Sequence, residues 1–264
     1  MASMLRLFLA WVCITLTFVE SAASLPAPVD SASVSLPPVA VPVSNPSSFH
    51  PAGLIVPGAL IAVGAVGASS RWFRREIDRP VTRALGSSRQ WRAADYLQFL
   101  PLAASFALPF AGLDTGYDTA DRLVAAATSF VILEAVTQPL KRVACRWRPD
   151  LSDDHSFPSG HTATAFAGAE RCRIYYGNWA GLAAYSVATG VAVLRIAGRH
   201  HWLSDCIAGA GIGILSARAA MWLLPLERRI LHHIPLVNRI SPTRFAAIPA
   251  LTPSSASLSL VALF

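Results

Sequence analysis

Charge, and lysine in particular, is scarce in this chain of 264 residues. Only 14% of the residues are charged, compared with about 25% in ordinary soluble domains. Lys141 is the single lysine among 22 lysine and arginine residues, and four cysteines are too few for a disulfide scaffold. Hydrophobic residues reach 53%, and the mean hydropathy is +0.46. These values exclude a largely disordered or fibrous chain, argue against an ordinary soluble domain and predict a membrane protein with several spans.

The remaining charge is unbalanced, with a formal net charge of +7 at pH 7. Such an excess is typical of proteins that bind nucleic acid, anionic lipid or a phosphorylated substrate. The sequence has no zinc-finger, basic-zipper or RNA-binding signature. We therefore expect the membrane bilayer and a phosphate compound as partners, and no nucleic acid. The sequence does not indicate the oligomeric state.

The N-terminal part of the chain divides into two segments before the main domain. Residues 1–23 resemble a secretory signal peptide, because Arg6 precedes an apolar stretch and small residues follow at 21–23. The alternative is a first membrane helix that is not cleaved. Residues 24–51 contain seven prolines, which predicts an extended or disordered linker.

The main domain is assigned to residues 52–226, where six apolar segments carry few or no charges. An uncharged segment of about 20 residues is long enough to cross a bilayer as a helix. The first two segments flank a basic stretch, 71–92, that holds seven arginines. Because no strand pattern or internal repeat is visible, we predict an all-α membrane bundle of about six helices. The six segments are 51–70, 96–113, 123–140, 162–169, 174–194 and 206–226.

Some features within these segments predict how the bundle packs. The sixth segment is rich in glycine and alanine, which favours close packing of helices in a membrane. Glu134 in the third segment and Arg218 in the sixth are expected to form a buried ion pair. Residues 227–264 are assigned to a C-terminal tail. Its end, 255–264, alternates leucine with small polar residues, and we favour a loosely packed terminus over a short strand.

Three clusters of polar residues lie at the ends of the apolar segments. The first contains Lys141, Arg142, Arg146 and Arg148 and ends at Pro149. Four cations in eight residues repel one another unless an anion lies between them. In isolation, such cations commonly anchor the end of a membrane helix at the interface. The role of this cluster therefore depends on the two clusters that follow.

The second cluster is the sequence Pro158-Ser159-Gly160-His161, which predicts a tight turn at the start of a helix. The N–H groups of Ser159 and Gly160 would then be available at a helix N-terminus, and such a terminus binds anions. His161 would lie at the mouth of that anion site. Taken alone, a single histidine near a helix start is more often a cap or a surface residue.

The third cluster contains Arg195, His201 and Asp205. The histidine and the aspartate are four residues apart, so on a helix they would share one face. A carboxylate that holds an imidazole fixes its tautomer and raises its basicity, which prepares the histidine to act as a nucleophile or a base. Such a pair is equally often structural when it occurs alone.

Together the clusters read Lys-x6-Arg-Pro, Pro-Ser-Gly-His and Arg-x5-His-x3-Asp, in this order. This set resembles the type 2 phosphatidic acid phosphatase (PAP2) superfamily, which also includes vanadium haloperoxidases and soluble bacterial acid phosphatases. The resemblance covers roughly residues 50–226. The stretches Pro158–Ala167 and His201–Ile214 also resemble a group of bacterial membrane phosphatases that act on lipid phosphates. One position departs from the pattern, because the third motif commonly begins Ser-Arg and here begins Leu194-Arg195. A hydroxyl near the phosphate is thereby lost.

The resemblance implies a PAP2/haloperoxidase-like helical fold and a role for each matching residue. His201 would attack phosphorus, and Asp205 would hold the other nitrogen of its ring. His161 would protonate the leaving group and then activate water. The residues implied to bind the phosphate are Lys141, Arg148, Ser159, Gly160 and Arg195. No metal and no cofactor are implied, and the aspartates at 150, 153 and 154 are expected to be solvated.

The expected function is that of a metal-independent phosphatase for a lipid phosphate or diphosphate, acting through a phosphohistidine intermediate. An exported, non-specific acid phosphatase of the same fold is the main alternative; a vanadate haloperoxidase and a non-catalytic membrane scaffold are two others. The long uncharged segments favour the membrane phosphatase. None of these considerations identifies the lipid.

We expect a bacterial inner-membrane protein whose active site faces the periplasm, although two arguments about its orientation conflict. A cleaved signal and the basic stretch 71–92 would place the three motifs in the cytoplasm under the positive-inside rule. The resemblance implies the periplasmic face. The two agree only if one apolar segment before Lys141 does not cross the membrane.

Overall fold

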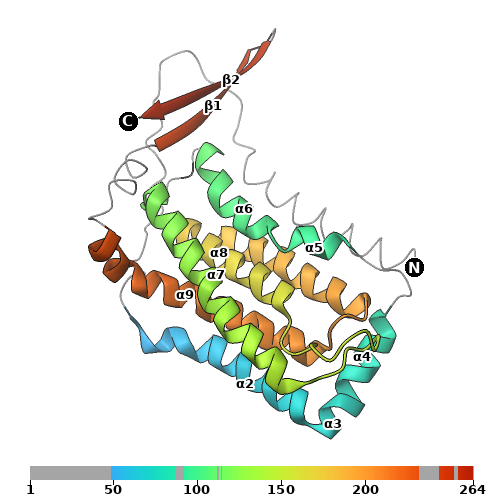
Figure 1. Ribbon diagram of the computed structural model, residues 1–264. Helices are drawn as coiled ribbons and strands as arrows, with labels where there is room; N and C mark the ends of the chain where they lie inside the picture. Colours follow the sequence, from blue (N-terminus) through green and yellow to red (C-terminus); the bar gives the residue numbers. More distant parts are fainter. Residues whose placement is uncertain are drawn as a thin grey trace. The chain divides into compact units, whose positions relative to one another are not determined.

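The computed structural model describes residues 49–86, 92–111, 113, 115–231, 244–252 and 255–263. The predicted signal peptide over 1–23 and nearly all of the predicted linker over 24–51 lie outside these ranges. Between residues 49 and 231 the described chain is an assembly of helices joined by turns and loops, which confirms the all-α prediction for this domain (Figure 1).

The helices differ widely in length. Among the described residues, four are long and apolar enough to cross a membrane, over Pro51–Ser69, Thr119–Ala144, Gly160–Ala197 and Leu203–Ile230. The chain is a membrane protein. The complete set is η1 (Pro51–Leu54), α2 (Ile55–Ser69), α3 (Arg71–Phe73), η2 (Arg74–Asp78), α4 (Arg79–Leu85), α5 (Ala93–Leu97), α6 (Leu100–Ala107), η3 (Leu108–Ala111), α7 (Thr119–Ala144), α8 (Gly160–Ala197) and α9 (Leu203–Leu231).

Helix α8 contains the predicted fourth and fifth segments and folds back on itself. Gly177, with φ 84° and ψ −173°, interrupts the helical backbone, and this region of φ is open to glycine and strained for other residues. On either side of the turn, the tilted rings of Phe166 and Tyr185 pack against each other with centroids 5.7 Å apart. The two arms are therefore antiparallel, so the Pro-Ser-Gly-His motif and Arg195 lie at the same end of the bundle.

The second apolar segment is broken into α5, α6 and η3. Pro101 lies in the first turn of α6 and Pro109 lies in η3, and proline cannot donate the backbone hydrogen bond of a continuous helix. The broken segment nevertheless follows the first arm of α8 along its length (Figure 1). Asp95 in α5 contacts His161 at the start of α8, and the Ser105 carbonyl in α6 accepts a hydrogen bond from Tyr176 beside the Gly177 turn.

Small residues bring the helices close together, as the sixth segment predicts. A Cβ atom on Gly211 would lie 2.6 Å from the Pro57 carbonyl oxygen in α2, and one on Gly209 would lie 2.5 Å from that of Ser159. The buried core is composed largely of alanine for the same reason. Larger apolar residues such as Val131 and Leu182 are exposed on the outside of the bundle, where a membrane would contact them.

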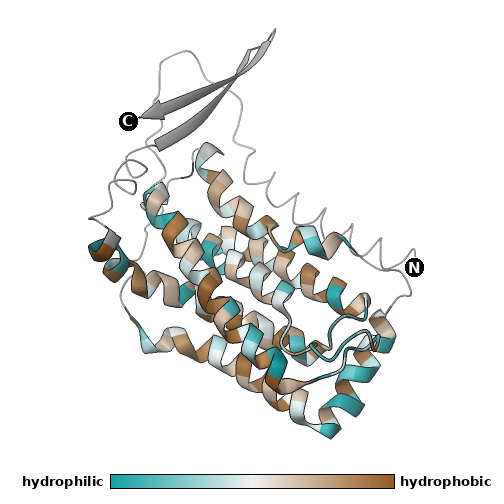
Figure 2. Ribbon diagram, viewed as in Figure 1, coloured by the Kyte–Doolittle hydropathy of each residue, from teal (hydrophilic) through white to brown (hydrophobic). Residues whose placement is uncertain are grey.

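The bundle has two distinct ends. Near the start of α2, the Gly53 carbonyl accepts a hydrogen bond from Arg218, in the second half of α9. Near its end, Gly67 packs against Ser204, at the start of α9. Helices α3 and α4 and the described part of the arginine-rich stretch follow directly, so they lie at the end where α9 begins. Figure 2 shows hydrophilic residues gathered around α3, α4 and the neighbouring loops.

Pro51 and Lys141 lie at opposite ends of this bundle. Three segments connect them, namely α2, the broken α5–α6 segment and α7, and each runs from one end to the other. Of these three segments, α2 and α7 are among the four membrane-length helices, and the broken segment is not. Lys141 therefore lies on the side of the membrane opposite to the side from which the chain enters α2.

The predicted pair between Glu134 and Arg218 is wrong. Glu134 accepts a hydrogen bond from Gln138 one turn along α7. Arg218 instead pairs with the fully buried Glu170 at 2.6 Å, and Arg173 pairs with the same carboxylate at 2.7 Å. Because these charges neutralise one another inside the bundle, α8 continues through Glu170 where the sequence predicted that the fourth segment would end.

The C-terminal part also differs from the expectation. Helix α9 continues to Leu231, past the predicted domain boundary at residue 226. Strands β1 (Arg244–Thr252) and β2 (Ser255–Leu263) then form an antiparallel pair with Arg244 opposite Leu263 and Thr252 opposite Ser255. Residues 255–263 thus form the short strand that was the less favoured alternative, and their alternation matches the two-residue period of a strand.

Candidate active site

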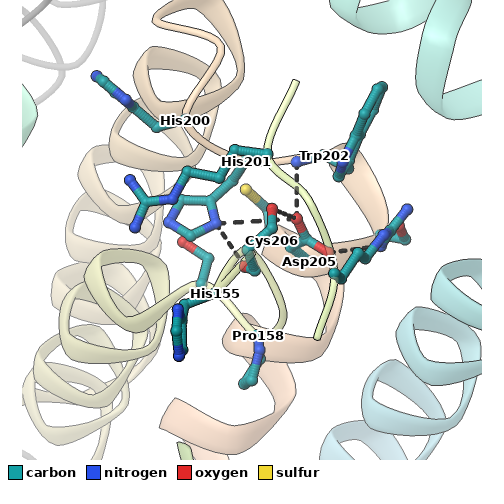
Figure 3. A network of polar contacts seen from close by, with 12 residues as sticks. His155, Pro158, His200, His201, Trp202, Asp205 and Cys206 are labelled. Carbon is teal, nitrogen blue, oxygen red and sulfur yellow. Dashed lines mark hydrogen bonds and ion pairs between the residues drawn. The ribbon is translucent and has the colours of Figure 1, made fainter. Parts of the chain in front are cut away.

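The three predicted motifs converge at one end of the bundle. Helix α7 ends at Ala144, and the loop that follows leads to the start of α8 and packs against the start of α9. The Ser156 hydroxyl donates a hydrogen bond of 2.5 Å to Asp205, and the Ser159 N–H donates one of 3.1 Å to the Asp205 carbonyl. These contacts join the loop to the His-x3-Asp motif (Figure 3).

His201 is almost fully buried, and its ring is held by the loop. Its Nδ1 atom lies 2.7 Å from the carbonyl oxygen of Ser156. A carbonyl oxygen only accepts hydrogen bonds, so Nδ1 carries the proton, and in the neutral ring Nε2 keeps its lone pair. Burial lowers the pKa of His201 to about 4. Asp205 opposes this shift and the cationic Arg195 adds to it.

Asp205 does not form the direct hydrogen bond to His201 that the sequence predicted. Its carboxylate lies 3.8 Å from Nδ1, beyond hydrogen-bonding range. One oxygen instead pairs with Arg146 at 2.5 Å, and the other accepts hydrogen bonds from the Ser156 hydroxyl and the Trp202 N–H. Asp205 therefore holds the peptide segment that holds His201, rather than holding the imidazole itself.

A buried ionic network supports Asp205 from behind. Arg146 bridges Asp205 and Asp78 of η2, and its distance to the Asp78 carboxylate is 2.7 Å. Asp78 also accepts hydrogen bonds from the N–H and the hydroxyl of Ser204. From the sequence, Arg146 was expected to lie at the membrane interface or behind the phosphate-binding residues, and no role was expected for Asp78. The only local signal for Asp78 is an acidic residue within an arginine-rich stretch.

His161 and Arg195 meet at a second residue that sequence analysis missed. One carboxylate oxygen of Asp95, in α5, lies 2.9 Å from His161 Nε2 and 3.1 Å from an Arg195 nitrogen. Asp95 is thus placed against the predicted acid and a predicted phosphate ligand. Its carboxylate occupies the position of an anion between two groups that are expected to contact the substrate.

The other predicted phosphate ligands line the same loop. The Lys141 ammonium donates hydrogen bonds to the carbonyls of His155 and Pro158, at 3.0 and 2.8 Å, which leaves one N–H free for a ligand. Arg148 forms an ion pair of 2.9 Å with Asp153. The aspartates that were expected to be solvated are thus partly engaged, since Asp150 also pairs with His200.

Ser159 and Gly160 form the predicted helix start, but their polar groups differ in availability. Ser159 is the N-cap of α8, where its side chain accepts a hydrogen bond from Thr162, and its own N–H is used by Asp205. Among the described residues, the N–H groups of Gly160 and His161 donate no hydrogen bond to a backbone carbonyl of a turn, loop or cap. These two groups, rather than Ser159, are therefore open to an anion at the helix N-terminus.

The arrangement can bind an anion and transfer a group from it. The charges of Lys141 and Arg195 act on both His161 and His201, and the charge of Arg148 acts on Lys141 and Arg195, so these groups lie near one another. Within the described part of the chain, no group of three or more His, Cys, Asp or Glu residues is arranged to hold a metal ion.

Comparison with known proteins agrees with the motifs. Residues 122–229 match the family model of the PAP2 superfamily. The lipid A 1-phosphatase of Porphyromonas gingivalis is 37% identical over 107 residues, which are 39% of this chain and 24% of that protein. The chain therefore spans about a quarter of the length of this relative.

A likeness to a solved structure was also found. The crystal structure of a transmembrane PAP2-type phosphatidylglycerolphosphate phosphatase from Bacillus subtilis aligns with a TM-score of 0.47 and 19% identity, over 68% of this chain and 98% of the other. The match of residues 122–229, which include all the predicted catalytic and phosphate-binding residues, is the stronger finding. Over these residues, the chain is similar to the PAP2 superfamily.

Proposed function

We propose that the chain is a metal-independent phosphatase that removes phosphate from a lipid phosphate or diphosphate through a phosphohistidine on His201. The observation that carries this proposal is the 2.7 Å contact between His201 Nδ1 and the Ser156 carbonyl. It leaves Nε2 as an unprotonated nucleophile, and the low pKa of the buried ring keeps it neutral near pH 7.

The reaction has two balanced steps. In the first, Nε2 attacks phosphorus, the P–N bond forms as the P–O bond to the leaving group breaks, and His161 gives a proton to the leaving oxygen. In the second, His161 takes a proton from water, and the water oxygen attacks phosphorus. The P–N bond then breaks, its electron pair returns to Nε2, and inorganic phosphate is released.

The basic residues have a distinct task in both steps. Charge on a phosphoryl group in transit is carried mainly by its three outer oxygens, so catalysis depends on positioning and neutralisation. Lys141, Arg148 and Arg195 would contact these oxygens. The N–H groups at the start of α8 would add two directed donors to the three cations.

A lipid substrate is supported by two observations. The relative is named for its action on lipid A, and the site lies at one end of a bundle with four membrane-length helices. An exported soluble phosphatase of the same fold would bury the apolar residues that are exposed here, for example Phe130 and Val131 of α7.

Phosphate release from a panel of substrates tests this function. The full chain, purified in detergent, would be given phosphatidate, phosphatidylglycerol phosphate, undecaprenyl diphosphate, lipid A phosphate and the water-soluble p-nitrophenyl phosphate. We expect a higher kcat/KM for at least one lipid than for p-nitrophenyl phosphate, inhibition by vanadate, and no loss of rate in EDTA. A rate that EDTA abolishes and a divalent ion restores would contradict the metal-independent mechanism.

We also propose that the protein lies in a bacterial inner membrane with its site facing the periplasm, as the PAP2 resemblance implies. Since Pro51 and Lys141 lie at opposite ends of the bundle, this orientation requires the chain to enter α2 from the cytoplasm. A cleaved signal peptide over 1–23 would require the reverse, so the two sequence-based expectations exclude each other. The clustered arginines at the site end are compatible with the periplasmic face if they serve to bind phosphate.

Labelling with a membrane-impermeant thiol reagent decides the orientation. With the native cysteines replaced, Ser152→Cys in the loop before α8 should react in intact spheroplasts, because residue 152 is exposed beside the site. A matched cysteine at Ala52, at the opposite end of α2, should react only after lysis. The reverse pattern would place the site in the cytoplasm and would support cleavage of residues 1–23.

A further inference from the structure

A cavity of about 440 Å³ lies beside the candidate active site. Neither His161 nor His201 lines this cavity, but Arg148, a predicted phosphate ligand, does. Trp202, the neighbour of His201, forms part of its wall and donates a hydrogen bond to the Trp147 carbonyl. The cavity and the phosphate site therefore share Arg148 and adjoin along Trp202.

The cavity has an excess of positive charge. Four arginines line it, at positions 74, 79, 146 and 148. Arg146 is neutralised by Asp78 and Asp205, and Arg148 is paired with Asp153. Among the described residues no carboxylate lies within ion-pair distance of Arg74 or Arg79. Two cations of this cavity are thus available to an anion.

Arg74 shows the effect of this imbalance. One of its terminal nitrogens donates a hydrogen bond to the Ala68 carbonyl, whereas its buried Nε has no hydrogen-bond partner. Burial, and then the nearby charge of Arg146, lower the pKa of the Arg74 guanidinium. Asp78 and Asp205 oppose this shift only in part. A buried donor without a partner and a partly compensated positive charge are both relieved by a bound anion.

The rest of the cavity wall is apolar and lies at the end of a membrane-length helix. Ala65 and Ala68 belong to the last turns of α2, and Phe157, Trp147 and Trp202 contribute aromatic surface. Trp147 is 57% exposed. Tryptophan beside arginine at the end of an apolar helix is typical of the zone where lipid head groups meet acyl chains. The cavity thus combines cationic and apolar surface at the depth of a head group.

We propose that this cavity binds a second phosphate of an amphiphilic substrate whose first phosphate reacts at His201. This inference rests on the proposed function and narrows its substrate class to lipids that carry two phosphates on separate positions. Arg148, which lies between the two sites, contacts both phosphates. Arg79 and Arg74 bind only the second.

A pair of substrates that differ only in the second phosphate tests this proposal. The full chain in detergent would be given a lipid with one phosphate and a lipid with the same acyl chains and two phosphates on separate hydroxyls. In Arg79→Gln, the ratio of kcat/KM for the second lipid to that for the first should fall about tenfold, the effect of one lost charge-assisted hydrogen bond. Arg75→Gln, an exposed arginine of the same stretch that does not line the cavity, should leave the ratio unchanged.

A binding experiment separates failure of this proposal from failure of the proposed function. Binding of the bisphosphorylated lipid in mixed micelles would be measured by calorimetry for His201→Ala, with and without Arg79→Gln. If no lipid releases phosphate but binding weakens about tenfold with Arg79→Gln, the function is wrong and the cavity assignment stands. If neither the kinetic ratio nor the binding responds to Arg79→Gln, the second phosphate site does not exist.

Discussion

His201 donates its Nδ1 proton to the carbonyl oxygen of Ser156, 2.7 Å away, while the Asp205 carboxylate remains at 3.8 Å. A neutral acceptor therefore fixes the tautomer of the predicted nucleophile. The Asp205 carboxylate positions His201 indirectly, because it accepts hydrogen bonds from the Ser156 hydroxyl and the Trp202 N–H. The ring can thus stay neutral and nucleophilic without a carboxylate bonded to it.

His201→Ala should abolish formation of the phosphoenzyme and lower kcat by a factor on the order of a thousand or more, because the nucleophile is lost. His200→Ala is the matched control. His200 precedes it in the chain and pairs with Asp150, and Figure 3 draws no contact between His200 and His201. The measurement is phosphate release together with trapping of labelled phosphate on the protein at alkaline pH, because the P–N bond of a phosphohistidine is labile in acid. A phosphoenzyme that persists in His201→Ala would remove the assignment.

The acid limb of the pH profile should lie well below that of an ordinary histidine. The pKa of His201 is lowered to about 4, chiefly by burial. Protonation of Nε2 removes the nucleophile, so activity from this group is retained above the pKa and falls as pH drops through about 4, tenfold per unit below it. An unperturbed histidine would already lose activity below about 6.5.

The measurement is kcat/KM against pH with p-nitrophenyl phosphate, corrected for the second ionisation of the substrate near 6. Loss of the His161 proton should produce the opposite limb and a bell-shaped profile. A nucleophile limb that remains near 6.5 after the correction would show that the His201 ring is more exposed to water than the structure indicates.

Asp78→Asn should destabilise the protein and reduce activity together. Asp78 is fully buried and pairs with Arg146, which in turn holds Asp205. Removing one partner of a buried ion pair costs about 3 kcal/mol, since the other charge is left buried. Thermal unfolding in detergent measures the loss, and Glu76→Gln, two residues away and exposed, is the control. Equal unfolding temperatures for both variants would contradict the network.

Lys141→Arg should lose most of the activity although the charge is kept. The ammonium reaches two carbonyl oxygens at 2.8 and 3.0 Å and still has one N–H for phosphate. A planar guanidinium presents its donors in a fixed fork and does not reproduce this compact geometry. The neighbouring Arg142→Lys, at an exposed position, is the control for a helix anchor. Near-normal activity of Lys141→Arg would favour anchoring over phosphate binding.

The sequence predicted the parts of the fold and site that depend on local pattern. Uncharged runs identified the long helices, and the glycines of α9 indicated close packing. In the structure the three motifs lie at one end of the bundle, because α8 folds back at Gly177. Asp78 and Asp95 could not be predicted, since their partners lie 68 and 66 residues away in the chain and no spacing rule connects them.

The wrong predictions have a related cause. Glu170 ended a predicted segment because it is charged, yet inside the bundle two arginines neutralise it and the helix continues. From sequence alone, a charged residue is taken to end an apolar segment, because its ion-pair partner is not known. That partner is identified only once the packing of the helices is known. Asp205 is a second example. Its sequence neighbour His201 is 3.8 Å away, whereas its ion-pair partner Arg146, at 2.5 Å, is distant in the chain.

Asp95→Asn should strengthen the binding of inorganic phosphate and lower kcat for alkyl phosphates. The Asp95 carboxylate contacts Arg195 and His161 in the position of a substrate oxygen, so it competes with phosphate for Arg195. Without the negative charge, inorganic phosphate should inhibit more strongly, with its inhibition constant lower by about three- to tenfold. The same carboxylate attracts the protonated ring of His161, so its loss should lower kcat for alkyl phosphates more than for p-nitrophenyl phosphate, whose leaving group needs little protonation.

Inhibition by phosphate and kcat for the two substrates are the readouts, and Gln98→Glu, which adds rather than removes a carboxylate one turn further along the chain, is the charge control. A variant in which kcat and phosphate binding fall together would show that Asp95 supports the site structurally and does not compete with its ligand.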